Sequence, residues 1–211
     1  RVNAIAQWYD EAILVGGDRT LQQVVGDPAS GGRLFEITEA TGMAWGQSWA
    51  MASDGSLYFV GSRGGIWRTA APVDGRIPPP VEITERSANR SLNFSTHHVR
   101  CVWHEEEDAL QVIVARRTGA ASTATEHWWV DAKTGALWVD KFADAGVIPQ
   151  SVAVLDGDDP DDRLVVYGCE DGRVRYYDNG AVSDDGTGIH SHVLIGPIVH
   201  RDEEFEQKIV G

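Results

Sequence analysis

The chain has 211 residues, with 32 acidic and 18 basic side chains and a formal net charge of −14. A content of 42% hydrophobic and 24% charged residues excludes a disordered chain, and the length is that of one domain with a sizeable core. An acidic surface repels phosphate groups, so the charge argues against nucleic acid or an anionic membrane as a partner.

Targeting and membrane signals are missing from the sequence. No stretch approaches the about 20 apolar residues of a membrane-spanning helix, and the N-terminus lacks the pattern of a secretion signal. The start at Arg1 and the stop inside an apolar run at Lys208–Gly211 indicate a piece of a longer protein or a processed chain. We interpret Cys101 and Cys169, both in apolar runs, as buried free thiols, with a single disulfide as the alternative.

Short apolar runs of strand length follow one another along the chain, and almost no window has the helical spacing of apolar residues. Turns that contain glycine, such as 53–55 and 170–172, separate these runs and allow the positive φ of tight hairpins. The predicted strands are Ile5–Trp8, Ala12–Val15, Leu21–Val25, Leu34–Ile37, Ser48–Met51, Leu57–Val60, Ile66–Thr69, Val81–Thr84, Val99–Trp103, Leu110–Ala115, Trp128–Val130, Leu137–Val139, Ser151–Leu155, Leu164–Tyr167, Val174–Tyr177 and Ile189–Ile195. The sequence therefore predicts an all-β antiparallel fold.

The hairpins recur in a fixed order along the chain. First strands begin near Ala4, Ser48, Val99 and Ser151, at spacings of 44, 51 and 52 residues. The segments Phe-Glu-Ile-Thr-Glu at 35–39 and Val-Glu-Ile-Thr-Glu at 81–85 are near copies, 46 residues apart. These spacings match the roughly 40–50 residues of one four-stranded propeller blade.

The predicted fold is a β-propeller of about four antiparallel blades, complete or part of a larger propeller. Its units are residues 4–42, 43–92, 93–147 and 148–200, followed by a terminal strand at 201–211 for which a short helix is the alternative. A β-sandwich of two sheets built from the same hairpins is the alternative fold.

Motifs of known enzyme classes are absent from the sequence. It contains neither the G-x-x-x-x-G-K-[ST] pattern nor the G-x-G-x-x-G pattern of nucleotide-binding loops. The zinc-protease motif H-E-x-x-H, which His104 and Glu105 would begin, has Asp108 in place of its second histidine. The segment Gly46–Ala50 lacks the final glycine of a nucleophile elbow. We therefore predict no catalytic residue and no enzymatic activity.

Two groups of side chains are candidate metal ligands. His190 and His192 stand two residues apart, on one face of a predicted strand. The loop that contains Asp156, Asp158, Asp159 and Asp161 offers carboxylate oxygens of the kind that Ca²⁺ prefers. Solvent-exposed side chains are the alternative interpretation of both groups. Apart from Ca²⁺, no cofactor is expected.

The eight tryptophans form the remaining unusual feature. Trp8, Trp49 and Trp103 fall in first strands of the units, and Trp67 and Trp138 in third strands. Large rings at corresponding positions favour packing between neighbouring sheets. The alternative is stacking against sugars, for which Trp45 is the candidate because it lies in a predicted loop.

Five segments together resemble propeller-bearing virion structural proteins of tailed bacteriophages. They are Trp8–Ile13, Gly26–Gly32, Asp54–Gly61, Asp156–Arg163 and Asp184–Ile198, so that the resemblance spans nearly the whole chain. It implies a tail, nozzle or baseplate component without a catalytic site.

The same resemblance implies the partners and the location. The partners would be other virion proteins or copies of this chain, in a particle assembled in the host cytoplasm. The alternative, from a different class, is a carbohydrate- or receptor-binding propeller with glycans as ligands, and a hydrolase acting through the Asp-rich turns is a third hypothesis.

Overall fold

The computed structural model describes residues 1–8, 12–84, 94–119, 125–142, 144–158 and 163–189. Within these ranges every regular element is a β-strand, apart from two short 3-10 helices, η1 (Pro28–Ser30) and η2 (Ala145–Val147). None of the described helices has the length and apolar character to cross a membrane. The all-β class predicted from the hairpin pattern is confirmed.

The strands form antiparallel sheets in which neighbouring strands follow one another in the chain. Sheet I contains β1 (Val2–Trp8), β2 (Ala12–Gly17), β3 (Leu21–Val25) and β4 (Arg33–Thr38). Sheet II contains β5 (Trp49–Met51), β6 (Leu57–Val60), β7 (Ile66–Thr69) and β8 (Val81–Glu82). Sheet III contains β9 (His97–His104), β10 (Ala109–Arg116), β11 (His127–Asp131) and β12 (Leu137–Asp140). Sheet IV contains β13 (Pro149–Leu155), β14 (Leu164–Cys169) and β15 (Val174–Tyr176), and a small hairpin of β16 (Ser183–Asp184) and β17 (Thr187–Gly188) follows it.

Acidic side chains and glycines shape the tight turns between these strands. In the β5–β6 turn, Gly55 has a φ of 78°, and the Ser56 N–H donates to Asp54 Oδ1 at 2.8 Å. In the β11–β12 turn, Asp131 Oδ1 accepts the N–H groups of Lys133 and Thr134, both at 2.8 Å. Such carboxylates stabilise the turn locally, because they satisfy backbone donors that the ladder leaves free.

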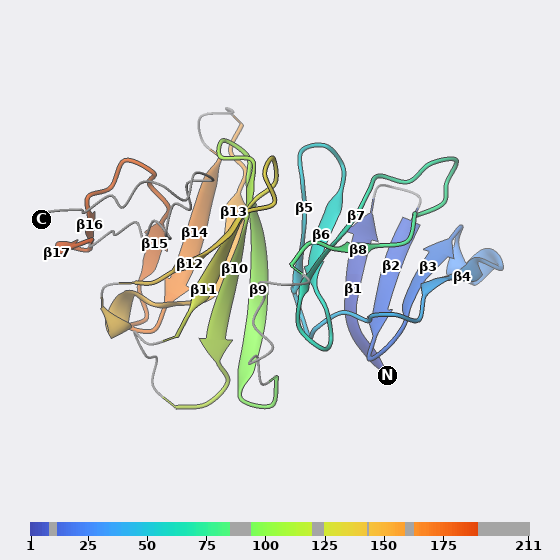
Figure 1. The fold of residues 1–211 in the computed structure, drawn as a ribbon, viewed down its shortest axis with the longest axis horizontal. Helices are drawn as coiled ribbons and strands as arrows, with labels where there is room; N and C mark the ends of the chain where they lie inside the picture. Colours follow the sequence, from blue (N-terminus) through green and yellow to red (C-terminus); the bar gives the residue numbers. More distant parts are fainter. Residues whose placement is uncertain (9–11, 85–93, 120–124, 143, 159–162, 190–211) are drawn as a thin grey trace, which may run out of the picture.

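Sheets I to IV form a row in chain order, with a hydrophobic core between sheets I and II, II and III, and III and IV. Sheets I and II lie in one half of the molecule, and sheets III and IV in the other (Figure 1). Sheets II and III, in the middle, have a hydrophobic core on each face, and the alternation along a strand divides their side chains between two neighbours. On β6, Leu57 and Phe59 join the core with sheet I, whereas Tyr58 and Val60 join the core with sheet III. This explains why all of β6 is buried.

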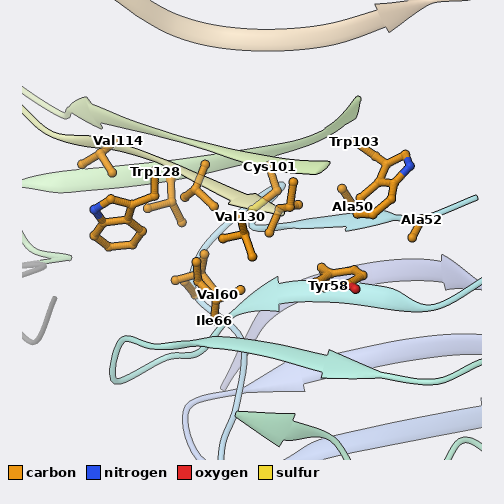
Figure 2. Packing of buried hydrophobic residues seen from close by; sticks show 14 residues of the cluster. Ala50, Ala52, Tyr58, Val60, Ile66, Cys101, Trp103, Val114, Trp128 and Val130 are labelled. Carbon is orange, nitrogen blue, oxygen red and sulfur yellow. The ribbon is translucent and has the colours of Figure 1, made fainter. Parts of the chain in front are cut away.

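The core between sheets II and III is seen from close by in Figure 2. Trp103 of β9 stacks on Tyr58 of β6, with ring centroids 5.2 Å apart. Trp128 and Val130 of β11 and Cys101 of β9 complete the side of sheet III. On its opposite face, sheet III presents Val102 and Ile113 to Val152, Tyr167 and Cys169 of sheet IV.

The tryptophans follow the predicted packing role in part. Trp8, Trp103 and Trp128 are buried, and Trp49 and Trp67 are half-buried against the core between sheets I and II. Trp138 departs from the prediction, because it lies in the fourth strand of sheet III and is 49% exposed. The separately predicted strands Trp128–Val130 and Leu137–Val139 form β11 and β12, which are joined by a tight turn.

The row of sheets is open in the described ranges, with sheets I and IV at its opposite ends (Figure 1). Five sheets are present there, rather than the two of the sandwich alternative. Strand β8 covers only the first half of the predicted Val81–Thr84, and the pairing of β16 with β17 was not predicted. Except for Ile189, the predicted strand Ile189–Ile195 lies outside the described residues, as does the terminal element at 201–211.

Burial predicts a large difference in stability between two tryptophans of sheet III. Trp128→Ala should lower the free energy of unfolding by about 3–5 kcal/mol, since it removes a ring that is 2% exposed and leaves a cavity. Trp138→Ala, in the neighbouring strand, should change it by less than about 1 kcal/mol. Urea unfolding followed by circular dichroism measures both values. Equal losses in the two variants would contradict the described packing.

Candidate functional site

A cleft of about 750 Å³ opens between sheets III and IV. Its walls are the β9–β10 turn, which contains Glu105, Glu106 and Glu107, and the segment after β13, which contains Asp156 and Asp158. Residues 176–179 at the end of sheet IV line it as well. Two acidic turns that are 50 residues apart in the chain therefore share one cleft.

Arg163 lies between these acidic turns and links them. Its Nη1 pairs with Glu105 Oε2, and its Nε lies 3.3 Å from Asp156 Oδ1. Asn179 adds a second connection, because its Nδ2 donates to Glu107 Oε1 at 3.0 Å. The cationic side chain offsets part of the repulsion between the turns, although each exposed pair contributes little stability by itself.

The predicted metal ligands are only partly within the described residues. Asp156 and Asp158 are exposed, and Asp156 pairs with Arg163. Asp159, Asp161, His190 and His192 lie outside the part of the chain that the structure describes. Among the residues within it, no group of three or more His, Cys, Asp or Glu side chains could hold a metal ion.

Trp45 lies in the connection between β4 and β5 and is half-buried. The guanidinium carbon of Arg1 lies 3.8 Å from the centroid of its ring. This cation–π contact occupies one face of the indole. Trp45 is thus a surface aromatic residue with a partner from the same chain on one side.

A buried polar network under the cleft was not predicted. Gln111 of β10 is 1% exposed, and its Oε1 accepts the hydroxyl of Tyr167 at 2.6 Å. His104 Nε2 lies 3.0 Å from the same oxygen, and Gln111 Nε2 donates to Asp140 Oδ2 at 2.9 Å. Because a carboxamide oxygen only accepts, His104 carries its proton on Nε2. The network joins β9, β10 and β12 of sheet III to β14 of sheet IV.

Aromatic rings surround this network. The His104 ring lies 4.6 Å from Trp129 and 4.5 Å from Tyr177, centroid to centroid. A cavity of about 210 Å³ adjoins the network, with Asp140, Tyr167 and Cys169 among its lining residues. The ring contacts and the polar groups therefore lie side by side at the junction between sheets III and IV.

Burial shifts the pKa of each of these ionisable groups in the direction that favours its neutral form. It raises the pKa of Asp140, to which nearby Asp184 also contributes, while the hydrogen bond from Gln111 acts in the opposite direction. Burial lowers the pKa of His104 and raises that of Tyr167. His104 is therefore a neutral side chain bound to an amide. The Tyr167–Gln111 hydrogen bond connects the two sheets at this junction.

An ion-pair cluster fixes the β16–β17 hairpin to sheet IV. Arg175 donates to both carboxylate oxygens of Asp171, at 2.9 and 2.7 Å, and to Asp185 Oδ2 at 2.6 Å. The guanidinium groups of Arg175 and Arg173, together with the backbone N–H of Arg173, hold the pKa of Asp171 well below its usual range. Bidentate ion pairs of this kind fix the relative orientation of the two side chains as well as their distance.

Both cysteines are buried free thiols, as predicted. Burial raises the pKa of the Cys101 thiol in the core between sheets II and III. Burial also raises the pKa of Cys169, which lies in the core between sheets III and IV. Both thiols are thus protonated at neutral pH, which is typical of structural cysteines.

The fold and this junction define an all-β chain of antiparallel sheets stacked face to face. No protein-family model matches the chain, and a comparison with curated proteins finds no significant match. The function is therefore inferred from the sequence and from the surfaces of the sheets.

Removal of Gln111 should strongly destabilise the chain. Gln111→Leu leaves Asp140, the Tyr167 hydroxyl and His104 Nε2 without this partner, at an expected cost of about 2–4 kcal/mol in unfolding free energy. Gln47→Leu, at an exposed position in the connection between β4 and β5, is the control and should cost less than about 0.5 kcal/mol. Chemical denaturation measures both. A loss in Gln111→Leu no larger than in the control would show that the network is dispensable.

The buried His127 makes stability dependent on pH. Its Nδ1 accepts the Val114 N–H at 3.0 Å, and burial lowers its pKa from 6.5 to about 4. As the pH falls below 6.5 the unfolded chain binds a proton that the folded chain does not, so stability is lost. His127 should account for a loss of about 2 kcal/mol between pH 7.5 and pH 5.

The variant His127→Asn separates this contribution from others, because an amide oxygen can still accept the Val114 N–H. His104 and Asp140 titrate in both proteins, so the difference in slope of stability against pH belongs to His127. Urea midpoints at pH 7.5, 6 and 5 give the two slopes. Parallel curves would contradict the assignment.

Proposed function

We propose that this chain is a non-enzymatic structural module of a tailed-phage virion. In this proposal its four stacked sheets are consecutive blades of a β-propeller, and it acts through protein–protein contacts. The observation that supports it most is a pair of apolar sheet faces, one at each end of the row.

The first of these faces is the outer side of sheet I, called here the sheet I end face. The register places Ile5 beside Val15, and Ile13 beside Val24, which in turn pairs with Leu34. Exposure is 61% for Ile5 and 58% for Leu34, whereas Leu14 and Leu21 on the inner side of the same sheet are buried. By strand alternation the polar members of the face are Gln7, Gln22 and Glu36.

The second face is the outer side of sheet IV, called here the sheet IV end face. Leu155 pairs with Leu164, and Tyr176 with Val166, which also pairs with Ala153. Val174 is 74% exposed and Tyr176 is 62% exposed. By strand alternation no charged side chain of the three strands belongs to this face.

These faces are unusual on a chain with a net charge of −14. Contiguous apolar patches on a protein surface mark sites of contact with other macromolecules. A further sheet packed on either face would bury it in the same way that the faces of sheets II and III are buried. Such faces suit a component of a larger assembly. The resemblance to virion structural proteins is the reason for proposing a phage particle as that assembly.

The alternative of a carbohydrate- or receptor-binding module has less support. Arg1 occupies one face of Trp45, which was the candidate for sugar stacking. The carboxylates of Glu105 and Asp156 at the cleft are paired with Arg163.

Purified particles test the proposal directly. The polypeptide should sediment with phage particles from the producing host through a density gradient, at a fixed ratio to the major capsid protein. Mass spectrometry measures the ratio, immunogold electron microscopy locates the chain, and an abundant host protein of similar size serves as the negative control. If the chain is no more enriched than that host protein, it is not a virion component.

A further inference from the structure

We infer that the sheet IV end face of one copy of this chain binds the sheet I end face of a second copy. The inference rests on the proposed function, since it names the partner through which the module assembles. It follows from the packing within the chain, the charge of the two faces and their position at opposite ends of the row (Figure 1).

The packing within the chain sets the pattern that this contact would continue. Sheets I and II, II and III, and III and IV each bury aliphatic and aromatic side chains between two facing sheets. The end faces offer the same kinds of side chain, in strands of similar length and with the same alternation. A second copy placed end to end would add a fourth interface of the same kind, from IV to I.

Charge restricts what can cover these faces. Two copies repel each other overall, because each has a net charge of −14. By strand alternation, however, the described strands of the two faces would bring only one charged side chain, Glu36 of β4, into the contact. An apolar sheet therefore fits these faces, whereas a polyanion or a strongly basic peptide would find no counterpart in them.

The contact is between two different surfaces, since each copy has one face of each kind. A head-to-tail contact covers both kinds at once, whereas a contact between two like faces would leave the other kind exposed. Head-to-tail contacts close into a ring or extend into a row, depending on the rotation between copies. Two copies of four sheets give eight, which is within the roughly four to eight blades of known propellers.

Sedimentation velocity of the chain tests the association. The mean mass should rise with concentration between about 1 and 100 μM, the range expected of a contact of modest area. It should rise further in 0.5 M salt than in 0.05 M salt, because salt screens the repulsion between acidic copies. A chain that stays monomeric at about 100 μM in both buffers overturns the inference.

Two single variants test the head-to-tail geometry. Ile5→Glu places a charge on the sheet I end face, and Val174→Glu places one on the sheet IV end face. Each variant should be monomeric when alone, at least 10-fold weaker in association than the unchanged chain. Both side chains are exposed, so circular dichroism and the urea midpoint should stay unchanged. Val73→Glu, at a position 67% exposed and outside both faces, is the matched control and should associate normally.

A mixture of the two variants gives the decisive result. The intact sheet IV end face of Ile5→Glu can bind the intact sheet I end face of Val174→Glu, so the mixture should form a 1:1 dimer that does not grow. If the mixture stays monomeric, or if Val174→Glu alone still forms dimers, the contact is not head to tail and the inference is lost.

The outcome for the proposed function is separate. A monomeric chain found in purified particles would overturn the inference and leave the function in place. A self-associating chain that is missing from particles would overturn the proposed function and leave the inference in place.

Discussion

Face-to-face packing of β-sheets is the constraint on which the rest of this structure depends. A sheet with apolar side chains on both faces leaves apolar surface in contact with water, at a cost in free energy, unless both faces are covered. Sheets II and III meet this condition inside the chain, and the fully buried β6 and Ala109–Ala115 of β10 are its result. Sheets I and IV meet it on one face only. The two exposed faces and the buried cores therefore have one physical origin, and the proposed function follows from the faces that remain uncovered.

A hydrogen bond between Tyr167 and Gln111 crosses the interface between sheets III and IV, and it belongs to a polar network that continues through sheet III. Gln111 forms hydrogen bonds with Tyr167 and Asp140 and contacts His104, and each partner comes from a different strand. Sheet IV cannot slide along sheet III without breaking the Tyr167–Gln111 hydrogen bond, while an aliphatic interface would tolerate a shift more easily. The network thus fixes the relative position of the two sheets. The position of the sheet IV end face, and of any partner bound to it, depends on this junction.

The acidic excess has a structural use in this fold. Asp54 and Asp131 accept backbone N–H groups within hairpin turns, and Asp171 does so while it also pairs with Arg175. At the cleft, Arg163 links two acidic turns that would otherwise repel each other. Negative charge is concentrated at turns and loops, whereas the end faces carry almost none. This separation keeps the edges of the row hydrated and leaves its end faces free to bind apolar surfaces.

The sequence by itself determined the all-β class, nearly all the described strands and the turns between them, because alternation and glycine-containing turns are local signals. It also indicated the burial of Trp8, Trp103, Cys101 and Cys169. Only the tertiary structure decided which sheet each strand face meets and that Trp138 lies at an exposed edge. It alone decided that Gln111, inside an apolar run, joins four strands, and that Arg163 links the acidic turns. Those contacts join residues that are far apart in the chain, and no local pattern specifies them. The same reason applies to the end faces, since an alternating strand shows that two faces exist but not which of them a neighbouring sheet covers.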